Sequence, residues 1–259
     1  MGNDTQIQVR KNGERPVAKT RPLELSRTAI EEYIKCPRCF YLHRVLKLAP
    51  PRTIPLTLAV ATDALLKIEF DKVRETGASH SLWDRYGLDM TAFNHSDLDQ
   101  WRNIRKGGIR AVHTETGYEI YGAVDDVWRN KNTGRLVIVD YKSTSKKEEP
   151  SLEGGFGPSY KRQIEIYQWI FKTAGFEVDP TAYFLYVNGR KTDQFYQNGS
   201  ELIGRMLFDT VLLPHEGNTD WVSHVIEQAV QCATSDRMPE ESRDCDNCKY
   251  FSERSAFLR

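Results

Sequence analysis

The stretch LVIVDYKST, residues 136–144, places an aspartate and a lysine inside a run of strand-forming residues. The run begins with four apolar residues, which is the pattern of a strand covered on both faces. Because side chains on a strand alternate between faces, Asp140 and Lys142 project from the same face as Ile138, next to the core. Charge at such a place is costly unless a partner or a metal ion compensates it, although a strand that simply ends there in solvent would also fit.

A second carboxylate, Asp125 in the segment GAVDD, precedes this strand. The segments YEIYGAVDDVWRN and RLVIVDYKST are both rich in strand formers, and the KNTG between them suits a tight hairpin turn. Such a hairpin would bring Asp125, Asp140 and Lys142 to one end of a sheet. Carboxylates are the ligands that Mg²⁺ or Mn²⁺ prefers, and a nearby lysine can orient an attacking water or neutralise charge on phosphorus. The predicted chemistry is hydrolysis of a phosphodiester bond.

Three helices are predicted to position these residues. Thr28 and Glu31 have the spacing of a capping box at the start of SRTAIEEYIKCPRCFYLHRVLKL. The segment LTLAVATDALLKIEFDKVRE is apolar over most of its circumference, which predicts a core helix, and Asp63 is an unusual carboxylate on its apolar stripe. The segment SYKRQIEIYQWIFKTAG is predicted to begin at Ser159 and to stop at Gly175.

The remaining segments complete a mixed α/β pattern. A strand, PTAYFLYVNG, is followed by an amphipathic helix, WVSHVIEQAVQCATS, whose Cys232 lies on the apolar face and is predicted to pack in the core. The order of helices, hairpin, helix, strand and closing helix predicts one domain over residues 23–259, with a mixed sheet flanked by helices. Residues 1–22 are predicted to form a basic, disordered arm.

The overall charge does not indicate a partner. Lys and Arg number 36 and Asp and Glu number 36, so the formal net charge is zero and any nucleic-acid site must be local. No apolar stretch resembles a membrane span or a signal peptide, which favours a cytoplasmic protein without a membrane partner.

Four of the five cysteines form two CxxC pairs, one near each end of the chain. Cys36 and Cys39 belong to CPRC, and Cys245 and Cys248 belong to CDNC. In a reducing compartment this pattern indicates metal binding more than disulfides, with free thiols in packed turns as the alternative.

The segments GAVD (122–125), DYK (140–142) and QIEIY (163–167) together resemble the motifs of the PD-(D/E)xK nuclease superfamily. They are most similar to its RecB-like branch, which includes the CRISPR-associated adaptation nucleases, and SRTAIEEYIKCPRCFYL resembles the opening helix of that branch. The resemblance spans Ser26 to Tyr250. It implies an α/β, restriction-endonuclease-like core with a mixed central sheet flanked by helices.

The resemblance also implies a Mg²⁺- or Mn²⁺-dependent deoxyribonuclease, exonuclease or endonuclease, and assigns its residues. The catalytic residues would be Asp125, Asp140, Lys142, Gln163 and Tyr167. Asp125 and Asp140 would be metal ligands, and Gln163 and Tyr167 would face the site from one side of their helix. The branch usually has a metal-binding histidine where this chain has Asp63, which makes Asp63 a candidate third metal ligand.

Cofactor and partner follow from the same resemblance. Relatives often hold an iron-sulfur cluster on one early and three late cysteines, whereas Cys39 here would complete a set with Cys36, Cys245 and Cys248. We therefore expect a 4Fe–4S cluster, with zinc as the alternative. The expected substrate is DNA with single-stranded ends, in repair, recombination or defence. One alternative is a catalytically impaired nucleic-acid-binding module of the same fold, because Asp63 replaces the histidine. The other is a metal-stapled scaffold whose cysteines matter and whose acids do not.

Overall fold

The computed structural model describes residues 23–50, 54, 56–190, 196–198, 200–204 and 206–257. The predicted basic arm, residues 1–22, lies outside the described residues. The helices are α1 (Arg27–Lys35), α2 (Pro37–Phe40), the π-helix η1 (Tyr41–Val45), α3 (Thr57–Thr76), α4 (Ser81–Arg85), α5 (Leu98–Trp101), the 3-10 helix η2 (Ile104–Lys106), α6 (Gly157–Thr173), α7 (Asp220–Thr234) and α8 (Asp246–Phe257). The strands are β1 (Glu24–Ser26), β2 (Met90–Ala92), β3 (Ile109–His113), β4 (Tyr118–Gly122), β5 (Asp126–Asn130), β6 (Leu136–Thr144), β7 (Thr181–Gly189), β8 (Tyr196–Asn198), β9 (Glu201–Ile203) and β10 (Phe208–Glu216).

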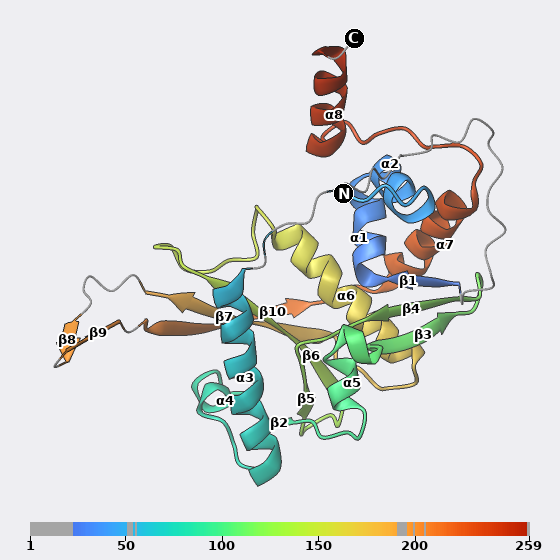
Figure 1. Ribbon diagram of the computed structural model, residues 1–259. Coiled ribbons are helices and arrows are strands. Elements are labelled where there is room, and N and C mark those ends of the chain that lie inside the picture. The colour runs from blue at the N-terminus through green and yellow to red at the C-terminus, as the bar shows by residue number, and fades with distance from the viewer. Residues whose placement is uncertain are drawn as a thin grey trace, which may run out of the picture.

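The central sheet is mixed, as the element order predicts. Its strands lie in the order β10-β7-β6-β5-β2, with β6 in the middle, antiparallel to β5 and parallel to β7 (Figure 1). The predicted hairpin between β5 and β6 is confirmed, with Asp126 opposite Val139. Because β6 is covered on both faces, its apolar residues from Leu136 to Val139 are all buried.

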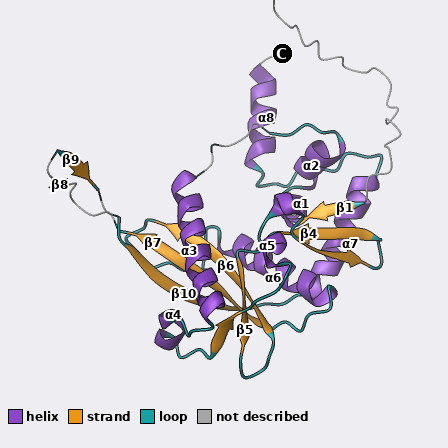
Figure 2. Cartoon of the chain, turned by 60° about the horizontal axis from the view of Figure 1, so that its bottom comes forward, coloured by secondary structure: helices purple, strands orange, loops and turns teal. Residues whose placement is uncertain are grey.

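Helices cover both faces of this sheet, which Figure 2 shows from a second direction. On one face, α3 packs against β6 over a cluster that includes Val137, Val139 and Tyr141. On the other face, α6 packs over a cluster that includes Ile138, and α1 and α7 pack with α6. The alternation along β6 therefore places Asp140 on the α6 side and Tyr141 on the α3 side.

The segment predicted as the first hairpin strand, YEIYGAVDDVWRN, is two strands in two sheets. Its first half is β4, which lies between β1 and β3 in a three-stranded sheet, and its second half is β5. The chain crosses between the sheets at residues 123–125, where Val124 donates its backbone N–H to the carbonyl of Trp101 at 3.1 Å. Asp125 consequently lies in the crossing and not within a strand.

The prediction that α3 is a core helix is wrong for its outer face. Leu58, Leu65 and Ile68 are more than half exposed, whereas Thr62 and Phe70 are buried against the sheet. An apolar residue is exposed when no further layer of the fold covers its face, so apolar periodicity alone overestimated the burial of this helix.

The predicted helix starts also differ from the observed ones. The side chain of Ser26, and not of Thr28, caps α1 by accepting the N–H of Ala29 at 3.1 Å. Glu31 is buried and bonds to Ser159 on α6 at 2.8 Å, so neither residue caps its own helix. Glu31 and Ser159, which local spacing predicted as capping residues, instead bond to each other across the contact between α1 and α6.

Candidate active site

Asp140, Lys142 and Gln163 form the centre of the site. Asp140 lies near the middle of β6 with 1% of its area exposed, and its Oδ1 accepts a hydrogen bond from Nε2 of Gln163 on α6 at 2.8 Å. Its Oδ2 forms an ion pair with Lys142, whose Nζ lies 3.4 Å from Oε1 of Gln163. The Lys142 ammonium group is also 4.3 Å from the ring centroid of Tyr160. Asp140, Gln163 and Tyr160 together fix its position.

The crossing between the two sheets brings Asp125 to the same place. Its Oδ2 accepts the backbone N–H of Tyr141, the residue after Asp140, at 2.7 Å. The next residue, Asp126, points to the opposite face, where it is fully buried and bonded to Arg74 and to the hydroxyl of Tyr141 at 2.8 Å. Of the two adjacent aspartates, Asp126 is therefore structural and Asp125 faces the site.

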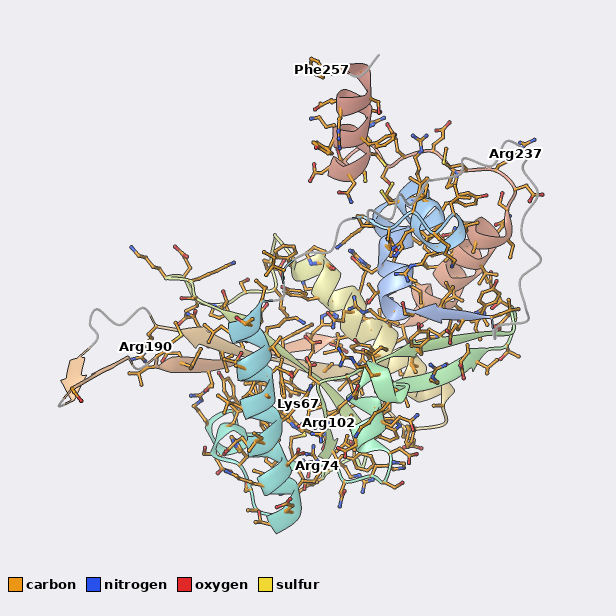
Figure 3. All side chains as sticks on the ribbon, in the orientation of Figure 1. Lys67, Arg74, Arg102, Arg190, Arg237 and Phe257 are labelled. Carbon is orange, nitrogen blue, oxygen red and sulfur yellow. The ribbon has the colours of Figure 1, made fainter. Side chains whose placement is uncertain are left out.

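A third carboxylate, Asp63, reaches the site from α3. Its Oδ2 lies 2.9 Å from Nζ of Lys67, one helical turn later, and that same Nζ lies 3.9 Å from Oδ1 of Asp125. Figure 3 shows Lys67 on α3. The Asp63 side chain is 33% exposed and the Asp125 side chain 25% exposed, so both border an accessible surface. The structure thus places Asp125 beside Asp140 and relates Asp63 to Asp125 through the ammonium group of Lys67.

Tyr167 completes the group of predicted residues. It lies one turn after Gln163 on α6, is buried, and its hydroxyl is 3.5 Å from Nε2 of Gln163. A Cβ on Gly122 would lie 2.6 Å from Cε1 of Tyr167, so only glycine at this end of β4 allows the ring to approach. The glycine of the GAVD motif therefore has a packing role beside the site.

The electrostatics of the site favour a bound cation. Burial, together with the charge of Asp140, raises the pKa of Asp125 to about 8, although Lys142 and Lys67 act in the opposite direction. The buried Oδ2 of Asp140 has the ammonium group of Lys142 as its partner. Two adjacent carboxylates are a set of hard oxygen ligands, and a Mg²⁺ or Mn²⁺ ion would compensate the charge of both. The residues present fit such an ion.

The four predicted cysteines also converge. Cys36 ends α1 and Cys39 lies on α2, while Cys248 lies on α8 and Cys245 just precedes it. Their sulfur atoms all lie within 4.8 Å of one another, with separations of 3.5 Å from Cys39 to Cys245 and to Cys248. This arrangement could hold a metal ion or cluster on thiolate ligands.

The cysteine site joins the end of the chain to α1. Apart from the thiols, Arg38 donates to the carbonyl of Pro239 at 3.1 Å and Ser242 donates its N–H to Sγ of Cys36 at 3.5 Å. The helix α8 itself extends away from the body (Figure 1), and Cys248 is its buried residue. Although burial acts to raise it, hydrogen bonds from the backbone of Ser242 and Cys39 lower the pKa of Cys36 to about 7. Cys232 lies apart and packs against the core, as predicted.

A comparison with known protein families identifies the superfamily of the chain. A sequence model of the PD-(D/E)XK nuclease superfamily matches residues 24–252. The chain belongs to the PD-(D/E)XK nuclease superfamily, and its mixed sheet flanked by helices is consistent with that fold. No curated protein matches the chain in a sequence search. Among the described residues, no helix has both the length and the hydrophobicity needed to span a membrane.

Two cations near the site were not predicted from the sequence. Lys67 follows Asp63 by four residues, a spacing that places both on one helix face and could have indicated it. Arg27 lies at the start of α1, whose first turn meets Gly122 of β4, and no sequence pattern relates it to Tyr167 or to the carboxylates.

Proposed function

We propose that the protein is a RecB-like nuclease that hydrolyses DNA with the help of Mg²⁺ or Mn²⁺. The observation that supports this most is the convergence of Asp125, Asp140 and Lys142 from a crossing segment and a buried strand. Asp126 is bonded to Arg74 and Tyr141 on the opposite face, whereas Asp125 and Asp140 are close enough for their negative charges to repel each other.

Asp125 and Asp140 would hold the divalent ion, with Asp63 as a third ligand. When bound, such an ion lowers the pKa of a water molecule and neutralises charge on phosphoryl oxygens. The raised pKa of Asp125 shows that its ionised form is unstable in the metal-free site. A bound cation would stabilise that ionised form.

The remaining residues act through position and charge. Lys142 is held by Asp140, Gln163 and Tyr160, so its ammonium is placed to hydrogen-bond an attacking water and to stabilise negative charge on phosphorus. Gln163 donates to Asp140 and orients that carboxylate. Tyr167 supports the Gln163 amide from the next turn.

The substrate and pathway are inferred from the motifs. GAVD, DYK and QIEIY stand in the order of the RecB-like branch, and four cysteines flank them, two on each side, where relatives often have one before and three after. We infer DNA with single-stranded ends as the substrate, and repair, recombination or defence as the setting.

A catalytically impaired binding module is the second candidate, and Lys67 is the observation that favours it. This ammonium contacts Asp63 and Asp125, where a metal ion would otherwise lie between carboxylates. If the Lys67 ammonium group stays between Asp63 and Asp125, the protein would keep its fold but would not bind a metal ion at these carboxylates.

The cysteine site is proposed to stabilise the domain. In a tetrahedral zinc site with Zn–S distances of about 2.3 Å, sulfur atoms lie about 3.8 Å apart. Three of the sulfur separations are 3.5 to 3.8 Å and all lie within 4.8 Å, which favours a single zinc ion over the 4Fe–4S cluster that the resemblance implies. An ultraviolet-visible spectrum and metal analysis of protein purified without oxygen distinguish the two.

The test of the main proposal is a cleavage assay. The full chain is incubated with labelled single-stranded DNA, duplex DNA and RNA, each with Mg²⁺, Mn²⁺ or EDTA. Metal-dependent cleavage of DNA that Asp140→Asn abolishes supports the nuclease. DNA binding without cleavage under any of these conditions supports the impaired module.

A further inference from the structure

The described part of the chain offers no acceptor to the guanidinium group of Arg27. It is the first residue of α1, is half-buried, and has no hydrogen-bond or ion-pair partner among the residues that the structure describes. Its Nε is buried and unpaired. A guanidinium group is always charged and carries five donors, so leaving it unpaired in a partly buried place is unfavourable unless a ligand supplies the acceptor.

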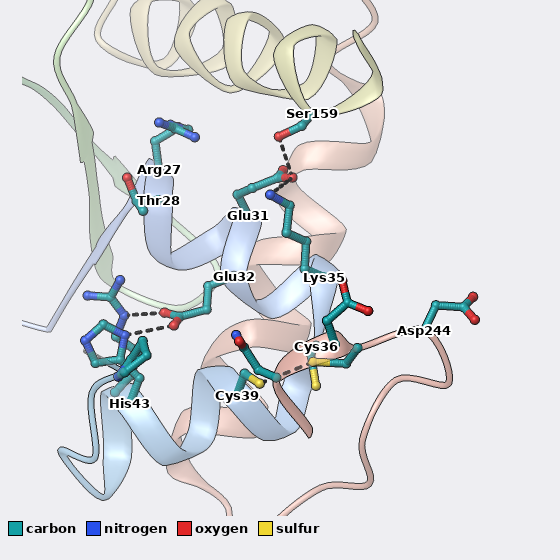
Figure 4. A pocket seen from close by; sticks show the side chains of 15 residues that line it. Arg27, Thr28, Glu31, Glu32, Lys35, Cys36, Cys39, His43, Ser159 and Asp244 are labelled. Carbon is teal, nitrogen blue, oxygen red and sulfur yellow. Dashed lines mark hydrogen bonds and ion pairs between the residues drawn. The ribbon is translucent and has the colours of Figure 1, made fainter. Parts of the chain in front are cut away.

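The surroundings of Arg27 form a pocket of about 580 Å³ between α1 and the cysteine site (Figure 4). The other cations that line it already have acidic partners. His43 and Arg44 bond to Glu32 at 2.8 and 2.9 Å, and Lys35 lies 3.7 Å from Glu31. In Figure 4, Arg27 extends from α1 away from the Glu32 pair, so its charge is not balanced by these carboxylates.

Arg27 also lies next to the candidate active site. A Cβ on Gly122 would lie 3.4 Å from Cβ of Arg27 and 2.6 Å from Cε1 of Tyr167, so both side chains flank the same glycine. The charge of Arg27 opposes the effect of burial, which raises the pKa of Tyr167 to about 12. Tyr167 is hydrogen-bonded to Gln163, and Gln163 in turn donates to Asp140, so a chain of side chains links the neighbourhood of Arg27 to the site.

We infer that Arg27 binds a backbone phosphate of single-stranded nucleic acid, one that flanks the bond to be cleaved. This inference rests on the proposed nuclease function. A guanidinium group can donate two parallel hydrogen bonds to a phosphate. A phosphate is also the acceptor that a nucleic-acid substrate would bring to this part of the protein. Pockets of this volume hold a small ligand such as a nucleotide, which selects a single strand over a duplex. Two acidic residues that line the pocket already have partners, since Glu31 bonds to Ser159 and Arg162 and Glu32 bonds to His43 and Arg44.

The experiment compares Arg27→Met and Arg27→Lys with the parent and with Arg44→Met, which removes a paired arginine from the same pocket. Binding of a fluorescent single-stranded oligonucleotide and of a blunt duplex is measured by anisotropy in EDTA across salt concentrations. For Arg27→Met we expect about tenfold weaker single-strand binding, since a charged hydrogen-bond partner is lost. The salt slope should fall by about 0.7, and duplex binding should change less. Arg27→Lys should keep the slope, and Arg44→Met should bind as the parent does.

The outcomes separate this inference from the nuclease proposal. In the cleavage assay Arg27→Met should raise KM and leave kcat nearly unchanged, because the residue binds and does not react. If the parent cleaves DNA and Arg27→Met matches it in affinity, slope and KM, the inference is wrong and the nuclease stands. An equal loss on duplex and single strand overturns the single-strand assignment. A parent that neither binds nor cleaves nucleic acid overturns both.

Discussion

Nζ of Lys67 lies 2.9 Å from Oδ2 of Asp63, one turn earlier on α3, and this ion pair stands at the side of the active site. The same ammonium is 3.9 Å from Asp125, so one lysine partly neutralises two of the three proposed metal ligands. Such a lysine would stabilise the metal-free site and compete with a divalent ion for the same carboxylates.

Replacing Lys67 should strengthen metal binding. We expect Lys67→Met to bind Mn²⁺ about two- to fivefold more tightly than the parent, because breaking partly exposed ion pairs of this kind costs only ~0–1 kcal/mol. Isothermal titration calorimetry measures the change. Lys72→Met is the control, since Lys72 is exposed on the same helix and has no ion pair with a described residue. Weaker Mn²⁺ binding by Lys67→Met would show that the lysine assists the ion.

Removing the lysine of the DYK motif should abolish cleavage and spare binding. For Lys142→Met we expect a rate at least about 10²-fold lower, because a preorganised charge at the phosphorus is lost. DNA affinity should change little, since phosphate contacts are spread over the surface. Single-turnover cleavage and anisotropy separate the two effects. The control is Lys161→Met on α6, which removes a lysine paired with the exposed Glu153 and should behave as the parent. Normal cleavage by Lys142→Met would remove Lys142 from the mechanism.

The raised pKa of Asp125 predicts a pH-dependent difference in stability. The folded value of about 8 exceeds the unfolded value, so the folded state binds the extra proton between about pH 4 and pH 8. Ionised Asp125 therefore destabilises the metal-free protein increasingly over that window, and fully above pH 8. In EDTA, the Tm of Asp125→Asn minus that of the parent should rise from pH 4 to pH 8 and then level off. A difference independent of pH would contradict the raised pKa.

Loss of one thiolate should release the end of the chain. Because α8 is attached chiefly through Cys245 and Cys248, we expect Cys245→Ser to purify with less zinc or iron and to melt at a lower temperature. Each kcal/mol lost corresponds to roughly 2–4 °C in a protein of this size. Elemental analysis and thermal denaturation provide the measurements, with Cys232→Ser as the control that should keep its metal. A parent without zinc or iron, whose four cysteines all alkylate, would refute the site.

Local periodicity was enough to predict part of the site. The two-residue repeat of a strand places Asp140 and Lys142 on one face of β6, and the spacing of four residues places Gln163 and Tyr167 on one face of α6. The buried character of β6 and its pairing with β5 also follow from apolar pattern and turn residues near each other in the chain. These relationships depend on backbone geometry over a few residues.

Only the tertiary structure decided which distant groups meet. The crossing from β4 to β5 aims Asp125 at the site and Asp126 at the opposite core, although both are aspartates in one motif. The packing of α3 across β6 brings Lys67 to Asp125, and the docking of α1 beside Gly122 brings Arg27 to the edge of the site. The same docking directs Glu31 and Ser159 to each other and away from capping. The sequence determines locally which side chains share a face of a strand or helix. Contacts between elements depend on how their faces pack, and this packing is determined only when the core assembles.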